Sequence, residues 1–327
     1  MRNYWSILLT FLVMGVALAA PASASGTGLV FVSNEKSSTI TVLDSDHKVV
    51  DSFPTCARPR GMHFTADRKG FFVACGDDDT IALYDISTQR LTKRFRDIPD
   101  PETFDLHPDG KHLYASNEDD AIVTVIDTET GEVTASYDTG EEPEGVLITA
   151  DGKLAFATSE AANLVHVIDI DKNEVIKDIK VGTRPRRFAL SPDGKELWVS
   201  AELSGIIDII DVASLKVIDE VAFLPPGMTR AQVTPVDLVM THDGTRAYVA
   251  LGRANHVAVV DVKSRQVLDY ILVGQRPWGL QLNRDETRLY VANGLSDDVT
   301  IIDTASDRGL ISVPVGQIPY GILIDDN

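Results

Sequence analysis

The sequence predicts an all-β protein arranged as one closed ring of seven four-stranded units, and two recurring markers support this. The first marker is a short apolar segment ending in Asp, at Asp44, Asp85, Asp127, Asp169, Asp211, Asp261 and Asp303. The second is a proline, at Pro59, Pro101, Pro143, Pro185, Pro235, Pro277 and Pro319. Both recur every 41 or 42 residues and share a single spacing of 50. Such a period is typical of a β-propeller, so we expect seven antiparallel blades.

Four short segments rich in Val, Ile, Leu and aromatic residues fill each unit. The first follows the marker Pro and runs into a turn that contains Asp and usually Gly, as at 107–110 and 149–152. Asp bonds its own turn and Gly tolerates positive φ, so this turn reverses the chain into the second strand. The third strand ends at the marker Asp, and the fourth leads to the next Pro. No helical periodicity interrupts this pattern after residue 25.

The way the ring closes follows from the phase of the repeat. After residue 25 the chain opens with a second strand, 29–33, and it ends with a first strand, 320–324. We therefore expect the last blade to combine the C-terminal inner strand with the three N-terminal strands. This pairing removes an open sheet edge. Residues 25–327 are predicted to form a single domain.

Residues 1–24 have the three parts of a secretory signal peptide. Arg2 supplies the charge, an apolar run covers 5–18, and the small residues at 22–24 provide a cleavage site. The alternative, an uncleaved membrane anchor, is disfavoured by the short apolar run. We expect a mature chain that begins near Ser25, outside the cytoplasm and not inserted in a membrane.

The composition excludes several classes of protein. Lys and Arg number 30 against 49 Asp and Glu, so the formal net charge is −19, and hydrophobic residues make up 44% of the chain. This acidity disfavours nucleic-acid binding, because phosphate backbones repel it. The apolar content is too high for a disordered chain. The repeated runs of about 20 apolar residues that a polytopic membrane protein needs are also missing.

The repeat resembles the YVTN-type seven-bladed β-propeller family, as in LYVANGLSDDVTIIDT at 289–304 and VPVGQIPYG at 313–321. Blade-specific strings, such as FFVACGDDDTI at 71–81 and AYVALGRANHVAVVD at 247–261, are similar to a subgroup associated with PQQ-dependent catabolism. The resemblance implies a periplasmic protein that works beside a quinoprotein dehydrogenase, a cytochrome c or a transporter component. It implies no cofactor bound to this chain, and it supplies no catalytic residues.

Candidate binding residues gather at one face of the ring, because the loops before the first strand and after the second strand share that face. Side chains beside the marker prolines converge there on the mouth of a central channel and form a pocket. The candidates at this mouth are Arg58, Arg60, Glu102, Glu144, Arg184, Arg186, Asp237, Arg276, Trp278 and Tyr320. The loops after the second strands add Glu35, Glu118, Glu160 and Glu202. These four could attract a cation, an amine or a basic partner. The simpler interpretation is solvated loop residues neutralised by neighbouring Arg.

One step deeper, His63 and Asp105 lie on adjacent blades. They form either a general acid/base pair or, more simply, a structural pair, since no nucleophile or orienting group accompanies them.

The two cysteines are predicted to form a disulfide. Cys56 precedes Pro59 by three residues, and Cys75 ends the strand that pairs with the strand following Pro59, so both thiols reach the same rim of one blade. An oxidising compartment favours the bond over free thiols. The chain contains neither a haem-attachment motif nor the ligand spacing of a closed metal site, so no metal is predicted.

The spacing of 50 reveals an insertion at residues 222–232, before the strand that follows Pro235. Two interpretations stay open. The insertion flanks the channel mouth or meets a partner protein, or it simply covers a blade edge.

Two functions compete. The main hypothesis is a periplasmic, non-enzymatic propeller that binds a small molecule or a protein partner and serves PQQ-dependent alcohol oxidation. The alternative is a lactonase-type hydrolase, because propellers of related repeat type include lactonases that use rim Glu, Arg and His residues. The alternative requires a carboxylate and an Arg or His within about 4 Å of a common point at the channel mouth. It fails if His63 is buried and the rim glutamates point to solvent. We exclude a quinoprotein dehydrogenase, because the chain has seven units and its cysteines are not adjacent.

Overall fold

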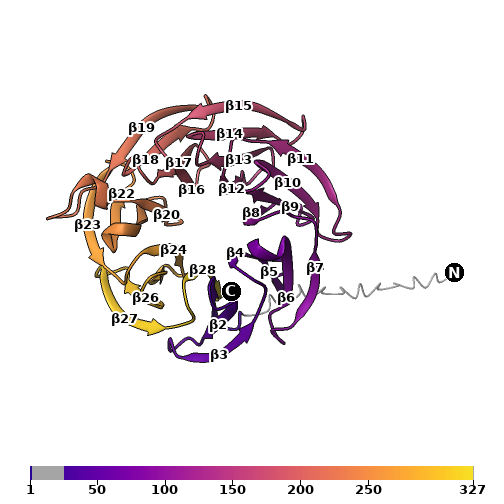
Figure 1. Ribbon diagram of the computed structural model, residues 1–327, viewed down its shortest axis with the longest axis horizontal. Coiled ribbons are helices and arrows are strands. Elements are labelled where there is room, and N and C mark those ends of the chain that lie inside the picture. The colour runs from indigo at the N-terminus through magenta and orange to yellow at the C-terminus, as the bar shows by residue number, and fades with distance from the viewer. Residues whose placement is uncertain (2–25, 327) are drawn as a thin grey trace.

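The computed structural model describes Met1 and residues 26–326, so nearly all of the predicted signal peptide lies outside the described residues. Seven four-stranded sheets surround a central axis (Figure 1). The predicted seven-bladed, all-β propeller is confirmed. In the part of the chain that is described, no helix is long and apolar enough to cross a membrane.

Each blade runs outward from an inner strand beside the axis. The inner strands are β4 (Pro59–Phe64), β8 (Pro101–Leu106), β12 (Pro143–Ile148), β16 (Pro185–Leu190), β20 (Pro235–Met240), β24 (Pro277–Leu282) and β28 (Pro319–Asp325). The second strands are β1 (Leu29–Asn34), β5 (Gly70–Cys75), β9 (His112–Asn117), β13 (Leu154–Ser159), β17 (Glu196–Ala201), β21 (Arg246–Leu251) and β25 (Arg288–Asn293).

The outer half of each blade holds the remaining strands. The third strands are β2 (Thr39–Leu43), β6 (Thr80–Asp85), β10 (Ile122–Asp127), β14 (Leu164–Asp169), β18 (Ile206–Asp211), β22 (His256–Asp261) and β26 (Asp298–Asp303). The outermost strands are β3 (Val49–Pro54), β7 (Leu91–Phe95), β11 (Val133–Asp138), β15 (Glu174–Lys180), β19 (Lys216–Ala222), β23 (Gln266–Leu272) and β27 (Arg308–Pro314). Three short 3-10 turns, η1 (Gly76–Asp78), η2 (Arg230–Gln232) and η3 (Gly252–Ala254), lie in loops.

The position of a strand in its blade explains its composition. Each blade packs between two neighbours, so the second and third strands are buried on both faces and read as nearly continuous apolar runs, as in β5 and β18. The outermost strands face solvent instead, and in β3 every residue but one is exposed. The core is therefore a ring of interblade layers.

The ring closes where β28 pairs antiparallel with β1, with Ile324 opposite Val30 and Ile322 opposite Val32. The resulting sheet has the order β28-β1-β2-β3. The predicted closure by the two ends of the chain is confirmed, and it places β28 between β24 and β4 beside the axis (Figure 1).

The marker Asp residues build the turns between third and fourth strands. Asp85 accepts a hydrogen bond from the N–H of Thr88 at 2.8 Å, and Asp127 accepts one from the N–H of Thr130 at 2.7 Å. A short side chain that bonds its own turn explains why the repeat keeps Asp there.

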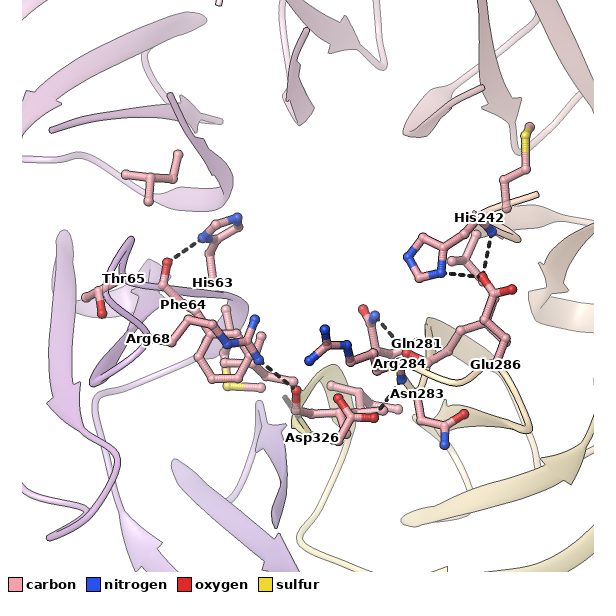
Figure 2. A pocket seen from close by; sticks show the side chains of 18 of the residues that line it. His63, Phe64, Thr65, Arg68, His242, Gln281, Asn283, Arg284, Glu286 and Asp326 are labelled. Carbon is pink, nitrogen blue, oxygen red and sulfur yellow. Dashed lines mark hydrogen bonds and ion pairs between the residues drawn. The ribbon is translucent and has the colours of Figure 1, made fainter. Parts of the chain in front are cut away.

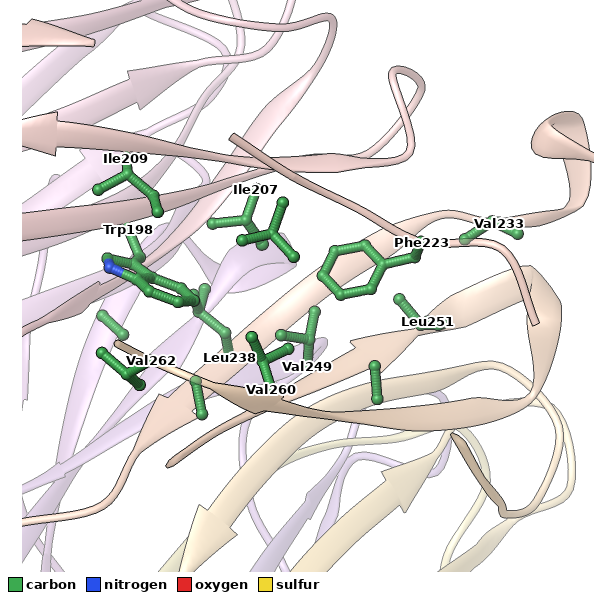
Figure 3. Close-up of a cluster of buried hydrophobic side chains, with 14 of the residues drawn as sticks. Trp198, Ile207, Ile209, Phe223, Val233, Leu238, Val249, Leu251, Val260 and Val262 are labelled. Atoms are coloured by element: carbon green, nitrogen blue, oxygen red, sulfur yellow. The ribbon is translucent and has the colours of Figure 1, made fainter. Parts of the chain in front are cut away.

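The insertion at 222–232 packs into the junction of two blades. Phe223 and Val233, which flank most of it, are buried with Trp198, Ile207 and Val249 in one apolar cluster (Figure 3). Within it, the Thr229 N–H donates to the side-chain oxygen of Gln232 at 2.9 Å and steadies η2. The segment therefore covers the junction between the blades that begin with β16 and β20.

Cys56 and Cys75 form a disulfide, with their Cα atoms 5.6 Å apart. Cys75 lies opposite Pro59 in the register of β5 with β4. Both residues are buried in the apolar cluster that also contains Phe31 and Phe71, at the junction with the closing blade. The bond thus ties the loop that follows the closing blade to the blade beginning with β4.

We expect the double variant C56A/C75A to unfold with a free energy lower by about 3 kcal/mol, because the bond restricts the unfolded chain over a loop of this length. Urea titration of the oxidised protein measures the difference. Wild type treated with a reductant should match the variant, whereas the variant itself should not respond to reductant. Equal midpoints for oxidised wild type and variant would contradict the expectation.

Candidate functional site

One hydrogen bond recurs in all seven blades and shapes the rim around the axis. The N–H of the residue after the second strand donates to the carbonyl of the residue before the marker Pro, as from Glu160 to Glu142 and from Glu202 to Arg184, each at 2.9 Å. Six of the seven residues before the marker Pro have a positive φ, for example 60° at Arg184 and 56° at Arg276. This conformation is unfavourable for residues with a Cβ. The repeated hydrogen bond offsets part of that cost and holds the two rim loops together.

A second device fixes the start of the inner strands. Thr158 accepts a hydrogen bond from the Gly145 N–H at 2.7 Å and donates one to the Arg186 carbonyl of the next blade at 2.9 Å. Ser200 likewise accepts from the Arg187 N–H and donates to the next blade. The register of β16 with β17 shifts at this point. A bulge of this kind re-aims side chains, so consecutive residues of β16 can both serve the site.

The residues after the marker prolines form a buried charged layer at the rim end of the axis. Arg186 is only 3% exposed and lies among three carboxylates. Its guanidinium is 3.0 Å from Glu144, 2.6 Å from Glu160 and 3.4 Å from Glu202. Arg184 lies 2.5 Å from Glu160, and Arg276 lies 2.8 Å from Glu202. The layer is therefore electrically balanced by direct pairs.

The basic and acidic candidates of the adjacent blades continue this layer. Arg60 pairs with Glu35 at 3.1 Å and also contacts Glu102, which is fully buried. Arg58 lies 3.1 Å from Glu102 and contacts Asp100. Carboxylate oxygens of Asp100, Glu102 and Glu118 also lie near one another. Because two guanidinium groups already contact this cluster, it is an ion-pair network rather than a cation site.

Two aromatic side chains complete the layer. The Tyr320 hydroxyl donates to Glu144 at 2.7 Å and accepts a hydrogen bond from Arg187 at 2.5 Å. The Trp278 ring lies 5.9 Å from the Tyr320 ring, centroid to centroid. The guanidinium of Arg276 lies over Trp278 at 4.3 Å. Cations over aromatic faces are favourable when they are shielded from water, so these rings help to hold the charges in place.

The structure brings most of the predicted site residues together, with two differences. Glu118 makes no ion pair with any described residue, and Asp237 lies one step deeper along the axis. The interpretation of the loop glutamates as solvated is wrong for Glu160 and Glu202, which are 4% and 0% exposed. Burial is possible because Arg side chains neutralise them within the layer.

Arg187 belongs to the site but was not among the residues predicted from the sequence. It follows Arg186 directly, and an alternating strand would turn the two side chains to opposite faces. The bulge in β16 cancels that expectation. Two adjacent arginines after a marker proline are visible in the sequence. They predict that both side chains reach the site only if the bulge is already known.

Below the charged layer lies an inner cavity of about 260 Å³. Arg187, Asp237, Gln281, Trp278 and Tyr320 line it, together with apolar side chains such as Leu238. Polar groups that converge on one cavity are the feature that orients a ligand in a small-molecule site.

The inner cavity continues into an outer cavity of about 710 Å³ at the end of the axis where first and second strands are joined. The two share lining from Met62, Val239, Gln281 and Ile322. Figure 2 shows the outer cavity, with the Arg284 side chain directed between His63 and His242. The way into the inner cavity thus runs from the face opposite the predicted mouth.

His63 and Asp105 lie 3.6 Å apart, and the His63 side chain is 40% exposed. Asp105 accepts hydrogen bonds from the N–H groups of Leu106 and Ile148, and so links β8 to β12. It lines neither cavity. These contacts favour the structural interpretation of the pair.

Asp237 makes the equivalent pair of bonds in another blade, with the N–H groups of Leu238 at 2.9 Å and Leu280 at 2.8 Å. Unlike Asp105, it lines the inner cavity. Burial raises the pKa of Asp237, while the positive charge of Arg187 opposes that shift. A cavity carboxylate with a raised pKa is a stronger base than an ordinary one.

The charged layer shifts the pKa values of two neighbouring carboxyl groups in opposite directions. Burial alone would raise the pKa of Glu144, but the positive charges of Arg186, Arg187 and Arg60 outweigh it and lower the pKa to about 2. Burial and the negative charge of Glu144 raise the pKa of Glu160 to about 7. Glu144 is therefore a fixed negative charge, and Glu160 titrates near neutral pH.

Residues 146–321 match the model of the family described as "Lactonase, 7-bladed beta-propeller". This range covers more than half of the 327 residues. The chain belongs to the seven-bladed β-propeller lactonase family. No curated protein matches this sequence.

Solved structures with the same fold include three with informative descriptions. Pseudomonas aeruginosa periplasmic gluconolactonase has 20% identity and a TM-score of 0.77, over 91% of this chain and 98% of that one. A putative 6-phosphogluconolactonase from Bacteroides fragilis has 19% identity and a TM-score of 0.75, over 94% and 99%. Hydrazine synthase from Kuenenia stuttgartiensis has 22% identity and a TM-score of 0.73, over 80% and 88%. At these identities the likeness concerns the fold alone.

Membership of the lactonase family overturns the main functional hypothesis. The prediction of a non-enzymatic accessory to PQQ-dependent oxidation is wrong, and the hydrolase alternative fits the family better. Blade-specific strings such as those at 71–81 and 247–261 belong to the strands and loops of the scaffold, so a resemblance in them does not decide between functions. The result that would exclude a hydrolase is not observed, since the His63 side chain is 40% exposed and the rim glutamates Glu160 and Glu202 are buried.

We expect the variant R186M to lose about 3–5 kcal/mol of unfolding free energy, because it leaves buried carboxylates without their shared cation. R184M is the matched control: Arg184 also contacts Glu160 and Glu202, but its side chain is 41% exposed. Its loss should stay near 1 kcal/mol or below. Urea unfolding monitored by circular dichroism measures both. Equal losses would show that burial of Arg186 does not matter.

The raised pKa of Glu160 predicts how the stability of the protein depends on pH. Because its pKa is about 7 when folded and 4.5 ordinarily, the folded chain binds more protons than the unfolded chain between these values. Stability contributed by this group therefore falls as pH rises from 4.5 to 7, by up to about 3 kcal/mol. In E160Q this slope should disappear, whereas E118Q should keep it. Urea unfolding at several pH values tests the difference, and an unchanged slope in E160Q would contradict it.

Proposed function

We propose that the protein hydrolyses a small lactone in the inner cavity, with Asp237 as general base and Arg187 as the group that stabilises the carbonyl oxygen. The observation that carries the proposal is the meeting of Arg187, Asp237 and Tyr320 on one cavity of about 260 Å³. Membership of a family described by lactonase activity supports the reaction class. A cavity of this size suits a single substituted ring, since pockets for drug-sized ligands measure roughly 300–1,000 Å³.

Lactone hydrolysis needs a base for the attacking water and donors for the oxygen that becomes negative. Asp237 takes a proton from water while the water oxygen bonds to the lactone carbonyl carbon. The tetrahedral intermediate then collapses, the ring C–O bond breaks, and the proton returns to the ring oxygen. The product is a hydroxy acid, with no cofactor consumed. Base catalysis of this kind contributes roughly 10²–10⁴-fold.

Arg187 is suited to the developing negative charge. Its hydrogen bond to Tyr320 and its ion pair with Glu144 both use Nη2. Within the described residues, Nε and Nη1 therefore have donors to spare for a ligand. Fixed donors in a site shielded from water stabilise an oxyanion strongly, because they need no reorganisation during the reaction.

Glu144 and Tyr320 act as positioning residues for Arg187. Glu144 stays ionised because its pKa is about 2. Burial raises the pKa of the Tyr320 hydroxyl, so the phenol stays neutral and keeps its proton for Glu144. Together they hold the guanidinium in one orientation at the wall of the cavity.

We extend the proposal to the kind of lactone and to the compartment. Neighbours in fold are described as a gluconolactonase and as a putative 6-phosphogluconolactonase, so sugar lactones are the first substrates to test. The predicted signal peptide and the disulfide support a periplasmic location. In that compartment the substrate would reach the site through the outer cavity. The predicted protein partners and the absence of a bound cofactor stay predictions.

We expect purified protein to release acid from glucono-1,5-lactone, its 6-phosphate or a related lactone faster than buffer alone, as followed by pH-stat. D237N should lower kcat about 10²-fold or more, because the base is lost. R187M should lower it about 10²–10³-fold, because an oxyanion donor is lost. D105N is the matched control, since Asp105 makes the same interstrand bonds outside the cavity, and it should keep wild-type kcat.

Two results would contradict the proposal. Absence of hydrolysis across sugar, γ- and δ-lactones by folded wild type would exclude the reaction. Equal losses of kcat in D105N and D237N would show that interstrand bonding, rather than base catalysis, explains the effect.

A further inference from the structure

One turn between a first and a second strand differs from its counterparts in the other blades. Residues 107–112 read His-Pro-Asp-Gly-Lys-His, with a histidine at each end and Asp109 between them. Ligand atoms of His107, Asp109 and His112 all lie within 4.8 Å of one another. The turn lines neither the inner nor the outer cavity, so its residues take no part in the proposed hydrolysis.

The same turn in other blades shows what ordinary turn chemistry requires. The residue at the position of His107 is a hydroxyl or amide residue: Thr65, Thr149, Ser191, Thr241 and Asn283. In each case its side-chain oxygen accepts a hydrogen bond from the N–H five residues later, at 2.8–3.1 Å. His107 gives up this bond, and the His112 N–H has only a 3.3 Å contact with Asp109 instead. A histidine at this position therefore stabilises the turn less than the Thr, Ser and Asn residues of the other blades do.

The structure orients the three side chains in the way that metal ligands are oriented. The His107 Nε2 lies 3.1 Å from the Gly152 carbonyl of the next blade. A hydrogen bond from this nitrogen to a carbonyl leaves the lone pair on Nδ1, where it accepts a 3.2 Å contact from the Asp109 N–H that a metal would replace. Asp109 is held by the Lys111 N–H at 2.8 Å, and its second oxygen lies 2.7 Å from His112 Nδ1. The Asp109 carboxylate therefore lies between the two histidines, 3.1 Å from His107 Nδ1 and 2.7 Å from His112 Nδ1.

We propose that His107, Asp109 and His112 bind one divalent transition-metal ion, Zn²⁺ or Cu²⁺, on the outside of the channel. Two imidazoles and a carboxylate suit these ions, and three protein ligands leave positions open for water. Binding replaces the weak contact of the Asp109 N–H with His107 at 3.2 Å and the pair of His112 with Asp109. Binding requires the lone pair of His112 Nδ1 to face the ion, which places the ring proton on Nε2.

The test is isothermal titration of the folded, tag-free protein with ZnCl₂ and, separately, CuCl₂, followed by electron paramagnetic resonance of the Cu²⁺ complex. We expect one equivalent to bind and the Cu²⁺ spectrum to show nitrogen coupling. H107T and H112L should each weaken binding more than tenfold and remove nitrogen coupling. Both variants restore residues found at the matching positions of the next turn, Thr149 and Leu154, so they should fold.

H242A is the control, because His242 is a highly exposed histidine of a similar turn and lies outside the cluster. It should bind the ion as wild type does. Failure of wild type to bind either ion stoichiometrically would overturn the proposal, as would binding that persists in H107T and H112L. Lactone hydrolysis should be the same in wild type and H112L, so the metal site and the proposed reaction can fail independently.

Discussion

The pairing of β28 with β1 is the contact on which the rest of the molecule depends. It turns two ends of the chain into one blade, and it places Tyr320 beside residues that precede it by more than a hundred positions. Without this pairing, the ring would keep an open edge between β24 and β4, and the inner strands would not surround one axis. Tyr320 could then no longer donate to Glu144 or hold Arg187.

Closure of the ring creates an electrostatic problem that the charged layer solves. Seven inner strands begin at nearly the same height, so the residues after their prolines crowd together and lose water. Charges in such a place are tolerated only in pairs, because the cost of removing an ion from water is several kcal/mol. Arg186 meets three carboxylates for this reason, and the pKa values of Glu144 and Glu160 move apart as a result. The layer also stabilises the inner cavity, because Glu144 and Tyr320 hold Arg187 in place at its wall.

The repeat also provides an internal standard for judging individual residues. Where several blades use the same residue type for the same hydrogen bond, that type is sufficient for the fold. A blade with a different residue at such a position therefore indicates a role other than stabilising the fold. Asp237 departs because it stands where four other blades have glycine, at Gly61, Gly145, Gly279 and Gly321, and it lines the inner cavity. His107 departs by abandoning a turn bond that five other blades keep.

Spacing along the chain is enough to predict the number of blades, the phase of the closure and which loops share the rim, because these properties follow from the repeat. It also identified most charged residues of the rim layer, such as Arg186 and Glu144. The burial of this layer and the opening of the cavity toward the opposite face become visible only in the folded ring. Arg187 escaped prediction because a bulge breaks the alternation of β16. Burial, bulges and cavity shape arise from contacts between blades, and no spacing within one blade encodes them.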